Sequence, residues 1–170
     1  MFLFSVISVS CTKKKPQIPD NKLNQNDSSS SEIIRLNQLL VEVEENEIKA
    51  YIDSSSYPFS AIESGMWMSI TKQGNGKKIE KNSLVEVAYQ VETLQGKICY
   101  TFTEQLKKQF VVGKLEKQRG LNIALTYLKE GDEAIFIVPS NLAYGALGDT
   151  KSIPPRASII YRIFTIKNTH

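Results

Sequence analysis

The sequence predicts an α+β domain: an antiparallel sheet of five or six strands wrapped on one short helix, preceded by a longer amphipathic helix. Apolar residues recur at three- and four-residue steps over 32–53, which is the helical period. From Gly65 onward the apolar period changes to two, as in half-buried strands. Only the short segment 121–128 returns to the helical period after that change. A run of strands with one short helix therefore indicates a sheet covered by that helix.

The predicted long helix begins at Glu32, because serine followed three residues later by glutamate has the spacing of a capping box. Its apolar positions are Ile33, Leu36, Leu40, Val43, Ile48, Tyr51 and Ile52. This stripe must pack on the following domain or on a second copy of itself, and the sequence leaves both open. We expect the acidic cluster of Glu42, Glu44, Glu45 and Glu47 to be a solvated face. Residues 32–63 thus form a helix and a connector.

Six segments after the connector are strand candidates. They lie at 66–71, 85–92, 97–102, 109–112, 134–138 and 158–166. The second shows the clearest alternation, with Val85, Val87, Tyr89 and Val91 on one face. The short helix ends before Gly131, a residue type that commonly follows a helix.

The composition excludes several kinds of chemistry. A net charge of +3 on 170 residues gives no basic surface of the kind that binds nucleic acid. The only histidine is His170, the last residue, so catalytic triads and histidine metal sites have no candidate on ordered backbone. The two cysteines, Cys11 and Cys99, are too few for a zinc cluster. We therefore expect no metal, no cofactor and no nucleic-acid partner.

The first eleven residues resemble a bacterial lipoprotein signal: an apolar stretch over 1–10, then Cys11, then three lysines. The resemblance implies cleavage before Cys11 and a lipid anchor on its thiol. No basic residue precedes the apolar stretch, which departs from such signals and leaves open whether the natural start lies upstream of Met1. The alternative is a frayed apolar terminus with a chance cysteine. Residues 11–31 are rich in serine, asparagine and proline, and are predicted to be a disordered tether.

A series of landmarks runs through residues 64–168. In order they are Val85-Glu86-Val87-Ala88-Tyr89, Gly96-Lys97, Phe110-Val111-Val112-Gly113, Arg119-Gly120-Leu121, Gly131, Pro139-Ser140-Asn141-Leu142-Ala143-Tyr144-Gly145 and Ile153-Pro154-Pro155. Their order and spacing resemble those of FKBP-type peptidyl-prolyl cis-trans isomerases. The resemblance implies an FKBP-like fold and an enzyme that rotates X-Pro peptide bonds in polypeptide clients.

The resemblance also assigns a pocket. Its positions are Tyr89, Cys99, Tyr100, Lys108, Lys117, Gln118, Leu121, Tyr144, Ile153 and Tyr161. Tyr89, Tyr144 and Tyr161 would surround the proline ring. The Tyr144 hydroxyl would bond one peptide carbonyl, and the backbone N–H of Ile153 or Gln118 would bond another. We expect Cys99 to be a small, unreactive filler.

The chain departs from the family pattern at four places in this pocket. Members with strong activity usually have tryptophan at Leu121, Phe-Asp at Cys99-Tyr100, an aromatic residue at Lys108 and an apolar residue at Lys117. A tryptophan buries about 150–250 Å², so its loss removes much of the aromatic floor. The missing aspartate removes a carboxylate that orients the loop tyrosine. We therefore predict reduced isomerase activity and weak binding of macrolide inhibitors.

Three functional hypotheses follow. The first is a prolyl isomerase assisting protein folding in the bacterial cell envelope, lipid-anchored at Cys11 and facing the periplasm or held at the outer membrane. The second is a binding or chaperone module with an FKBP-like fold and weak or no isomerase activity. The third is a cytosolic isomerase. The layout resembles FKBP-type lipoproteins of gliding Bacteroidetes, which implies a link to gliding motility. Residues 32–53 are a candidate arm for dimerisation or for client binding.

Overall fold

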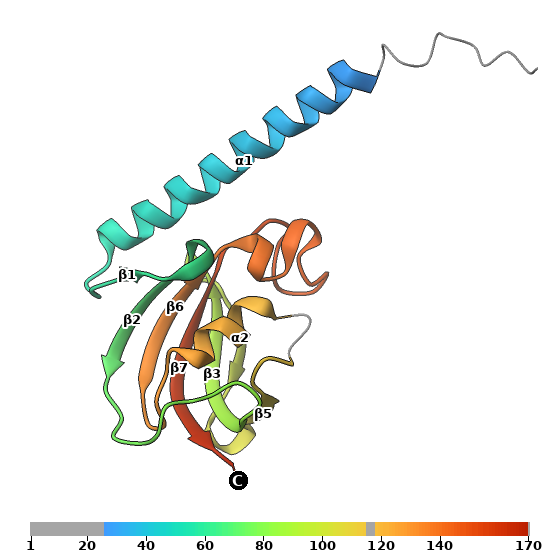
Figure 1. Cartoon of the computed structure of the whole chain (residues 1–170). Helices are drawn as coiled ribbons and strands as arrows, with labels where there is room; N and C mark the ends of the chain where they lie inside the picture. The colour runs from blue at the N-terminus through green and yellow to red at the C-terminus, as the bar shows by residue number, and fades with distance from the viewer. Residues whose placement is uncertain (1–25, 115–117, 170) are drawn as a thin grey trace, which may run out of the picture. The chain divides into compact units, whose positions relative to one another are not determined.

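The structure is a computed structural model that describes residues 26–114 and 118–169 (Figure 1). Its helices are α1 (Asn26–Ser54) and α2 (Arg119–Thr126), with short 3₁₀ turns η2 (Glu63–Gly65), η3 (Glu104–Leu106), η4 (Ser140–Leu142) and η5 (Gly145–Leu147). Its strands are β1 (Ser60–Ala61), β2 (Trp67–Lys72), β3 (Leu84–Thr93), β4 (Ile98–Phe102), β5 (Lys108–Val111), β6 (Glu133–Val138) and β7 (Ile159–Asn168). Contacts divide the chain into one unit ending at Leu39 and a second from Leu40 to His170. The second unit contains the sheet, α2 and the C-terminal half of α1.

All strand pairs described are antiparallel, in the order β1-β2-β6-β7-β3-β4, with β5 also pairing with β3. This confirms the predicted α+β class. The sheet has seven strands in the described residues instead of five or six. The additional strand is β1, whose two residues are too short to show an alternating pattern.

One face of the sheet packs against α2, as Figure 1 shows. The alternating residues of β3 that the sequence indicates, Val85, Val87, Tyr89 and Val91, are all buried in this core. Leu121 of α2 is fully buried against them. Burial of each large apolar side chain stabilises the fold by about 1.5–3 kcal/mol. Tyr89, one of the predicted site residues, is thus held in place by the packing of this core.

The opposite face of the sheet packs against the C-terminal half of α1. Ile48 is 4% exposed and contacts a cluster that includes Ile135, Ile137 and Ile160. Arg162 of β7 donates from Nη2 to the Tyr51 hydroxyl at 3.4 Å. These contacts answer the question that the sequence left open for Ile48, Tyr51 and Ile52: they pack on the domain.

Helix α1 is longer than predicted, because it begins at Asn26 instead of Glu32. Residues 26–31, predicted as part of the tether, are therefore helical. Asn, Asp and Ser are the residue types that open helices, so the polar composition that indicates a tether also suits a first helical turn. The earlier apolar positions remain exposed, between 49% and 60%, at Ile33, Ile34, Leu36, Leu39, Val41 and Val43.

Several predictions fall outside the described residues: the signal segment, Cys11, the tether as far as residue 25, and Lys117. Within the described ranges, no helix is both long enough and apolar enough to cross a membrane. The same ranges contain no group of three or more side chains placed to hold a metal ion.

Candidate functional site

A cleft of about 280 Å³ lies where β3 and β4 meet the start of α2 and the loop between β6 and β7. It is lined by Tyr89, Val91, Tyr100, Phe102, Gln118, Tyr144, Asp149 and Lys151. The structure thus brings together four of the predicted site residues: Tyr89, Tyr100, Gln118 and Tyr144.

Aromatic rings form one side of the cleft. The Tyr89 ring packs against Phe102, Phe110 and Tyr161, with centroid distances of 4.8, 5.9 and 5.9 Å. Phe102 also stacks on Tyr100 at 6.5 Å. Burial, and then the neighbouring Tyr144, raise the pKa of the Tyr89 hydroxyl, so it stays protonated at physiological pH. The result is a rigid, neutral, largely apolar surface suited to a proline ring.

Tyr144 lies in the loop, where it immediately precedes η5. Its side chain is half-buried, and its hydroxyl accepts a hydrogen bond from Gln118 Nε2 at 3.1 Å. Because Gln118 supplies a donor, the Tyr144 hydroxyl can donate its own hydrogen into the cleft. Gln118 was predicted to act through its backbone N–H. In the structure it is the side chain of Gln118 that takes part in the site.

Asp149 organises the segment that follows Tyr144. Its Oδ1 accepts the backbone N–H groups of Lys151, Ser152 and Ile153 at 2.9, 2.9 and 2.8 Å, and its Oδ2 accepts the Tyr100 hydroxyl. Partial burial opposes ionisation of Asp149, but these hydrogen bonds outweigh it and lower its pKa to about 2. The site therefore holds a carboxylate that is ionised at neutral pH.

These bonds bear on two predictions. The carboxylate that seemed lost at Tyr100 is present in the cleft, but it comes from Asp149 on the loop and bonds Tyr100 itself. The backbone N–H of Ile153, predicted to bond a substrate carbonyl, is already donated to Asp149. Ile153 is 3% exposed, and its side chain belongs to the hydrophobic core.

Three further predicted residues lie under or beside the cleft. Leu121 and Tyr161 are fully buried. The Tyr161 hydroxyl lies near that of Tyr144, but among the described residues no partner meets the geometry of a hydrogen bond with it. Cys99 is half-buried, with its Sγ 3.5 Å from the Ser152 carbonyl oxygen, and burial raises its pKa, which keeps the thiol protonated.

Two lysines lie at or beside the cleft. Lys108 Nζ lies 5.0 Å from the centroid of the Phe102 ring, where a cation is attracted to an aromatic face. Lys151 is exposed and lines the cleft. Where the family pattern has an aromatic residue, this chain has Lys108, whose ammonium group covers part of the Phe102 ring.

Sequence reasoning missed Val91, Phe102, Asp149 and Lys151 as lining residues. Phe102 had a usable signal, because it is two residues from Tyr100 on one strand and so shares its face. Asp149 had a weaker one, because Asp often accepts backbone N–H groups a few residues further on in a turn. No sequence pattern predicts that Lys151 lines the cleft.

An antiparallel sheet with one helix on this face, and an aromatic cleft closed by a tyrosine-bearing loop, define an FKBP-like domain. A family model described as "FKBP-type peptidyl-prolyl cis-trans isomerase" matches residues 75–166, more than half of the chain, and the chain belongs to this family. A probable FKBP-type isomerase of Neisseria meningitidis, FkpA, is 32% identical over 104 residues, which cover 61% of this chain and 38% of that protein. Arabidopsis thaliana FKBP42 is 29% identical over 150 residues, which cover 84% of this chain and 40% of that protein. The chain therefore spans about two fifths of the length of these two relatives.

Solved structures support the fold. A peptidyl-prolyl isomerase from Pseudomonas syringae superposes with a TM-score of 0.67 at 23% identity, covering 78% of this chain and 96% of that one. The N-terminal domain of Arabidopsis FKBP42 gives 0.60 at 26% identity, with 67% and 95% covered. The first likeness, at this identity, shows the fold alone.

Proposed function

We propose that this protein is a peptidyl-prolyl cis-trans isomerase acting on proline-containing polypeptides. The observation that carries the proposal is the Tyr144 hydroxyl, held by Gln118 beside the ring packing of Tyr89 and Phe102. Membership of the FKBP-type family supports it.

The reaction matches the chemistry of this cleft. Rotation of an X-Pro bond must overcome a barrier of about 18–20 kcal/mol that arises from amide resonance, and no covalent bond breaks. The twisted amide has lost charge separation, so an apolar surface such as Tyr89 and Phe102 favours it over the planar form. Tyr144 donates its hydroxyl hydrogen to a carbonyl oxygen of the peptide and fixes its orientation. None of these steps needs a general base.

Replacing Tyr144 with phenylalanine should lower kcat/KM for Xaa-Pro peptides by roughly three- to tenfold, because one hydrogen bond contributes about 0.5–1.5 kcal/mol net. A protease-coupled assay on the full chain measures this. Tyr127→Phe is the matched control, since Tyr127 lies at the end of α2 and is 37% exposed. Equal rates for the wild type and the Tyr144 variant would overturn the role given to this hydroxyl.

The second candidate function is an FKBP-like binding or chaperone module with little turnover. It is favoured by the fully buried Leu121, which offers no aromatic floor, and by Lys108 over the Phe102 ring. For the same reasons we expect the isomerase to be slower than typical members and to bind macrolide inhibitors weakly. Peptide binding without acceleration in the same assay would identify the module.

We further propose that the protein works in the bacterial cell envelope, anchored by lipid on Cys11, and that it is linked to gliding motility. The proposal rests on the apolar segment 1–10, Cys11 and the polar residues that follow. Mass spectrometry of the membrane fraction should find a mature chain that begins at lipidated Cys11. An unmodified Cys11 in a soluble fraction would favour the cytosolic isomerase, and unchanged colony spreading after gene deletion would remove the link to gliding.

A dimer through residues 32–53 is a final proposal. Its support is the exposed apolar stripe that includes Ile33, Leu36 and Val43. Sedimentation equilibrium of the full chain should show dimers that Leu36→Asp converts to monomers, and monomers at every concentration would exclude this arm.

A further inference from the structure

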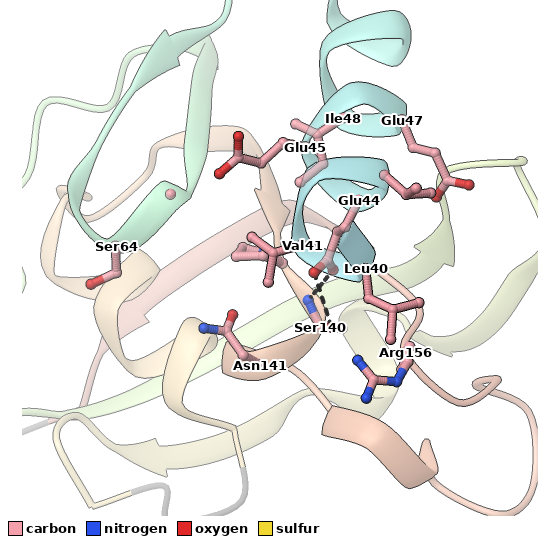
Figure 2. Close-up of a pocket in the computed structure, with 13 residues that line it drawn as sticks. Leu40, Val41, Glu44, Glu45, Glu47, Ile48, Ser64, Ser140, Asn141 and Arg156 are labelled. Atoms are coloured by element: carbon pink, nitrogen blue, oxygen red, sulfur yellow. Dashed lines mark hydrogen bonds between the residues drawn. The ribbon is translucent and has the colours of Figure 1, made fainter. Parts of the chain in front are cut away.

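Helix α1 contributes a carboxylate to the base of the active-site loop, defined here as residues 140–158 (Figure 2). Glu44 Oε1 accepts the backbone N–H of Ser140 at 2.6 Å and the Ser158 hydroxyl at 2.5 Å. Its Oε2 accepts the Ser140 hydroxyl at 3.2 Å. Glu44 was predicted to lie on a solvated face. The structure corrects this, because one carboxylate accepts three hydrogen bonds from residues far away in sequence.

The two serines occupy equivalent places at the two ends of the loop. Strands β6 and β7 are neighbours, and their last pair is Val138 with Ile159. Ser140 follows β6 and Ser158 precedes β7, so both lie just beyond the last rung of this ladder. Both are buried, at 8% and 5% exposure. Their donors need an acceptor that the strands do not provide there, and Glu44 supplies it.

The position of Ser140 determines that of Tyr144 through a short, bonded path. Ser140 opens η4, whose last residue, Leu142, is 5% exposed and belongs to the core. The Ala143 N–H is donated to the carbonyls of Pro139 and Ser140, both at 3.1 Å, and Tyr144 follows directly. The same loop holds Asp149 further along. A shift at the base therefore moves both the Tyr144 hydroxyl and the Asp149 carboxylate.

We infer that Glu44 is a positioning residue for the isomerase site: it joins both ends of the active-site loop and sets the place of the Tyr144 hydroxyl. A carboxylate suits the task because it is an acceptor only and its two oxygens can serve three donors. A glutamine of the same shape would offer one oxygen and turn an amide donor toward a donor. For its catalytic readout the inference rests on the proposed isomerase activity.

The test compares Glu44→Gln with two controls in the full chain. Glu45→Gln changes the adjacent, exposed carboxylate. Glu45 and Glu44 both line the pocket that Figure 2 draws. Ile48→Ala weakens the packing of the same helix on the sheet without touching Glu44. Three quantities are measured: kcat/KM, amide hydrogen exchange over 140–158, and the emission of Trp67. Trp67 is the only tryptophan and packs against the Ile48 cluster, so it reports whether α1 stays on the sheet.

We expect Glu44→Gln to lower kcat/KM by about five- to tenfold, less than the roughly hundredfold cost of a 1 Å misplacement, because the glutamine keeps one of the two acceptor oxygens. Hydrogen exchange should become faster within 140–158, while Trp67 emission stays at its wild-type wavelength. Ser158→Ala, which removes one donor of the three, should give a smaller effect in the same direction. Glu45→Gln should match the wild type, and Ile48→Ala should shift Trp67 emission but keep kcat/KM within about twofold.

Two results would overturn the inference. Unchanged exchange over 140–158 in Glu44→Gln would show that the loop does not depend on this carboxylate. An equal loss of activity and an equal Trp67 shift in Glu44→Gln and Ile48→Ala would assign Glu44 to helix packing alone. If the wild type has no isomerase activity, the proposed function fails, and the exchange measurement still decides whether Glu44 orders the loop.

Discussion

Replacing Asp149 with alanine should lower kcat/KM for prolyl peptides by about tenfold or more, because losing about 1.4 kcal/mol of transition-state stabilisation has that effect. The alanine variant releases four donors at once: the Tyr100 hydroxyl and the N–H groups of Lys151, Ser152 and Ile153. The segment that closes the cleft then has no common acceptor. The protease-coupled assay measures the loss of activity. The melting temperature of the variant shows whether it is still folded at the assay temperature.

Asp149→Asn provides the graded control. The amide retains one oxygen for the backbone donors, but its nitrogen cannot accept the Tyr100 hydroxyl. We therefore expect an intermediate rate, close to that of a Tyr100→Phe variant. Wild-type activity in the alanine variant would show that the loop keeps its conformation without this carboxylate.

The pH dependence follows from the lowered pKa of Asp149, which is about 2 in the folded chain. An unfolded aspartate has a pKa of about 3.9, so the stabilising contribution of Asp149 is complete above that value. It is lost as pH falls from about 4 through the folded pKa. Between pH 5 and 8, kcat/KM should therefore show no step from this group. A step in kcat/KM within this pH range would mean that a group other than Asp149 controls the site.

The second large effect is expected for Gly148→Ala. Gly148 has φ +67°, and a Cβ there would lie 2.2 Å from the Ile153 carbonyl oxygen and 2.7 Å from the Pro154 carbonyl carbon. These are backbone atoms of the loop that carries Asp149, so the loop must move to admit the methyl group. We expect a loss of isomerase activity greater than tenfold and a lower melting temperature.

Gly96→Ala is the matched control for this effect. Gly96 has φ +81°, but within the described ranges no residue beyond its two chain neighbours has an atom within 4 Å of a Cβ built there. Its cost should be that of the left-handed backbone alone, about 1–2 kcal/mol, with activity unchanged. If both variants lose the same stability and activity, the close contact at Gly148 has no consequence beyond its backbone conformation.

The fold could be predicted because its signal is local. The two-residue period at Val85, Val87, Tyr89 and Val91 reports burial on one face directly, and these residues are in the core. Tyr89 was a candidate for both the core and the site, and the structure gives it both positions: it is 2% exposed and lines the cleft. Strand β1 was not predicted, because two residues are too few to show an alternation of apolar and polar side chains.

The site could be predicted only in part, because several of its contacts join residues far apart in sequence. Tyr144 could be predicted from its loop motif alone. The bond between Tyr100 and Asp149 crosses 49 residues, and Glu44 reaches Ser158 across 114. Glu44 lies four residues after Leu40 and four before Ile48, so helical spacing separates it from Glu42 and Glu45. Its serine partners are set only by folding.

The packing of α1 on the sheet has a practical consequence for dividing this protein into fragments. The family match begins at residue 75 and the FKBP-like landmarks begin near residue 64. A fragment cut at either point would expose the apolar face of Ile135, Ile137 and Ile160 to water, an aggregation hazard. It would also lack Glu44. The smallest piece suited to crystallisation, inhibitor screening or fusion to another protein therefore begins no later than Leu40, where the second unit begins.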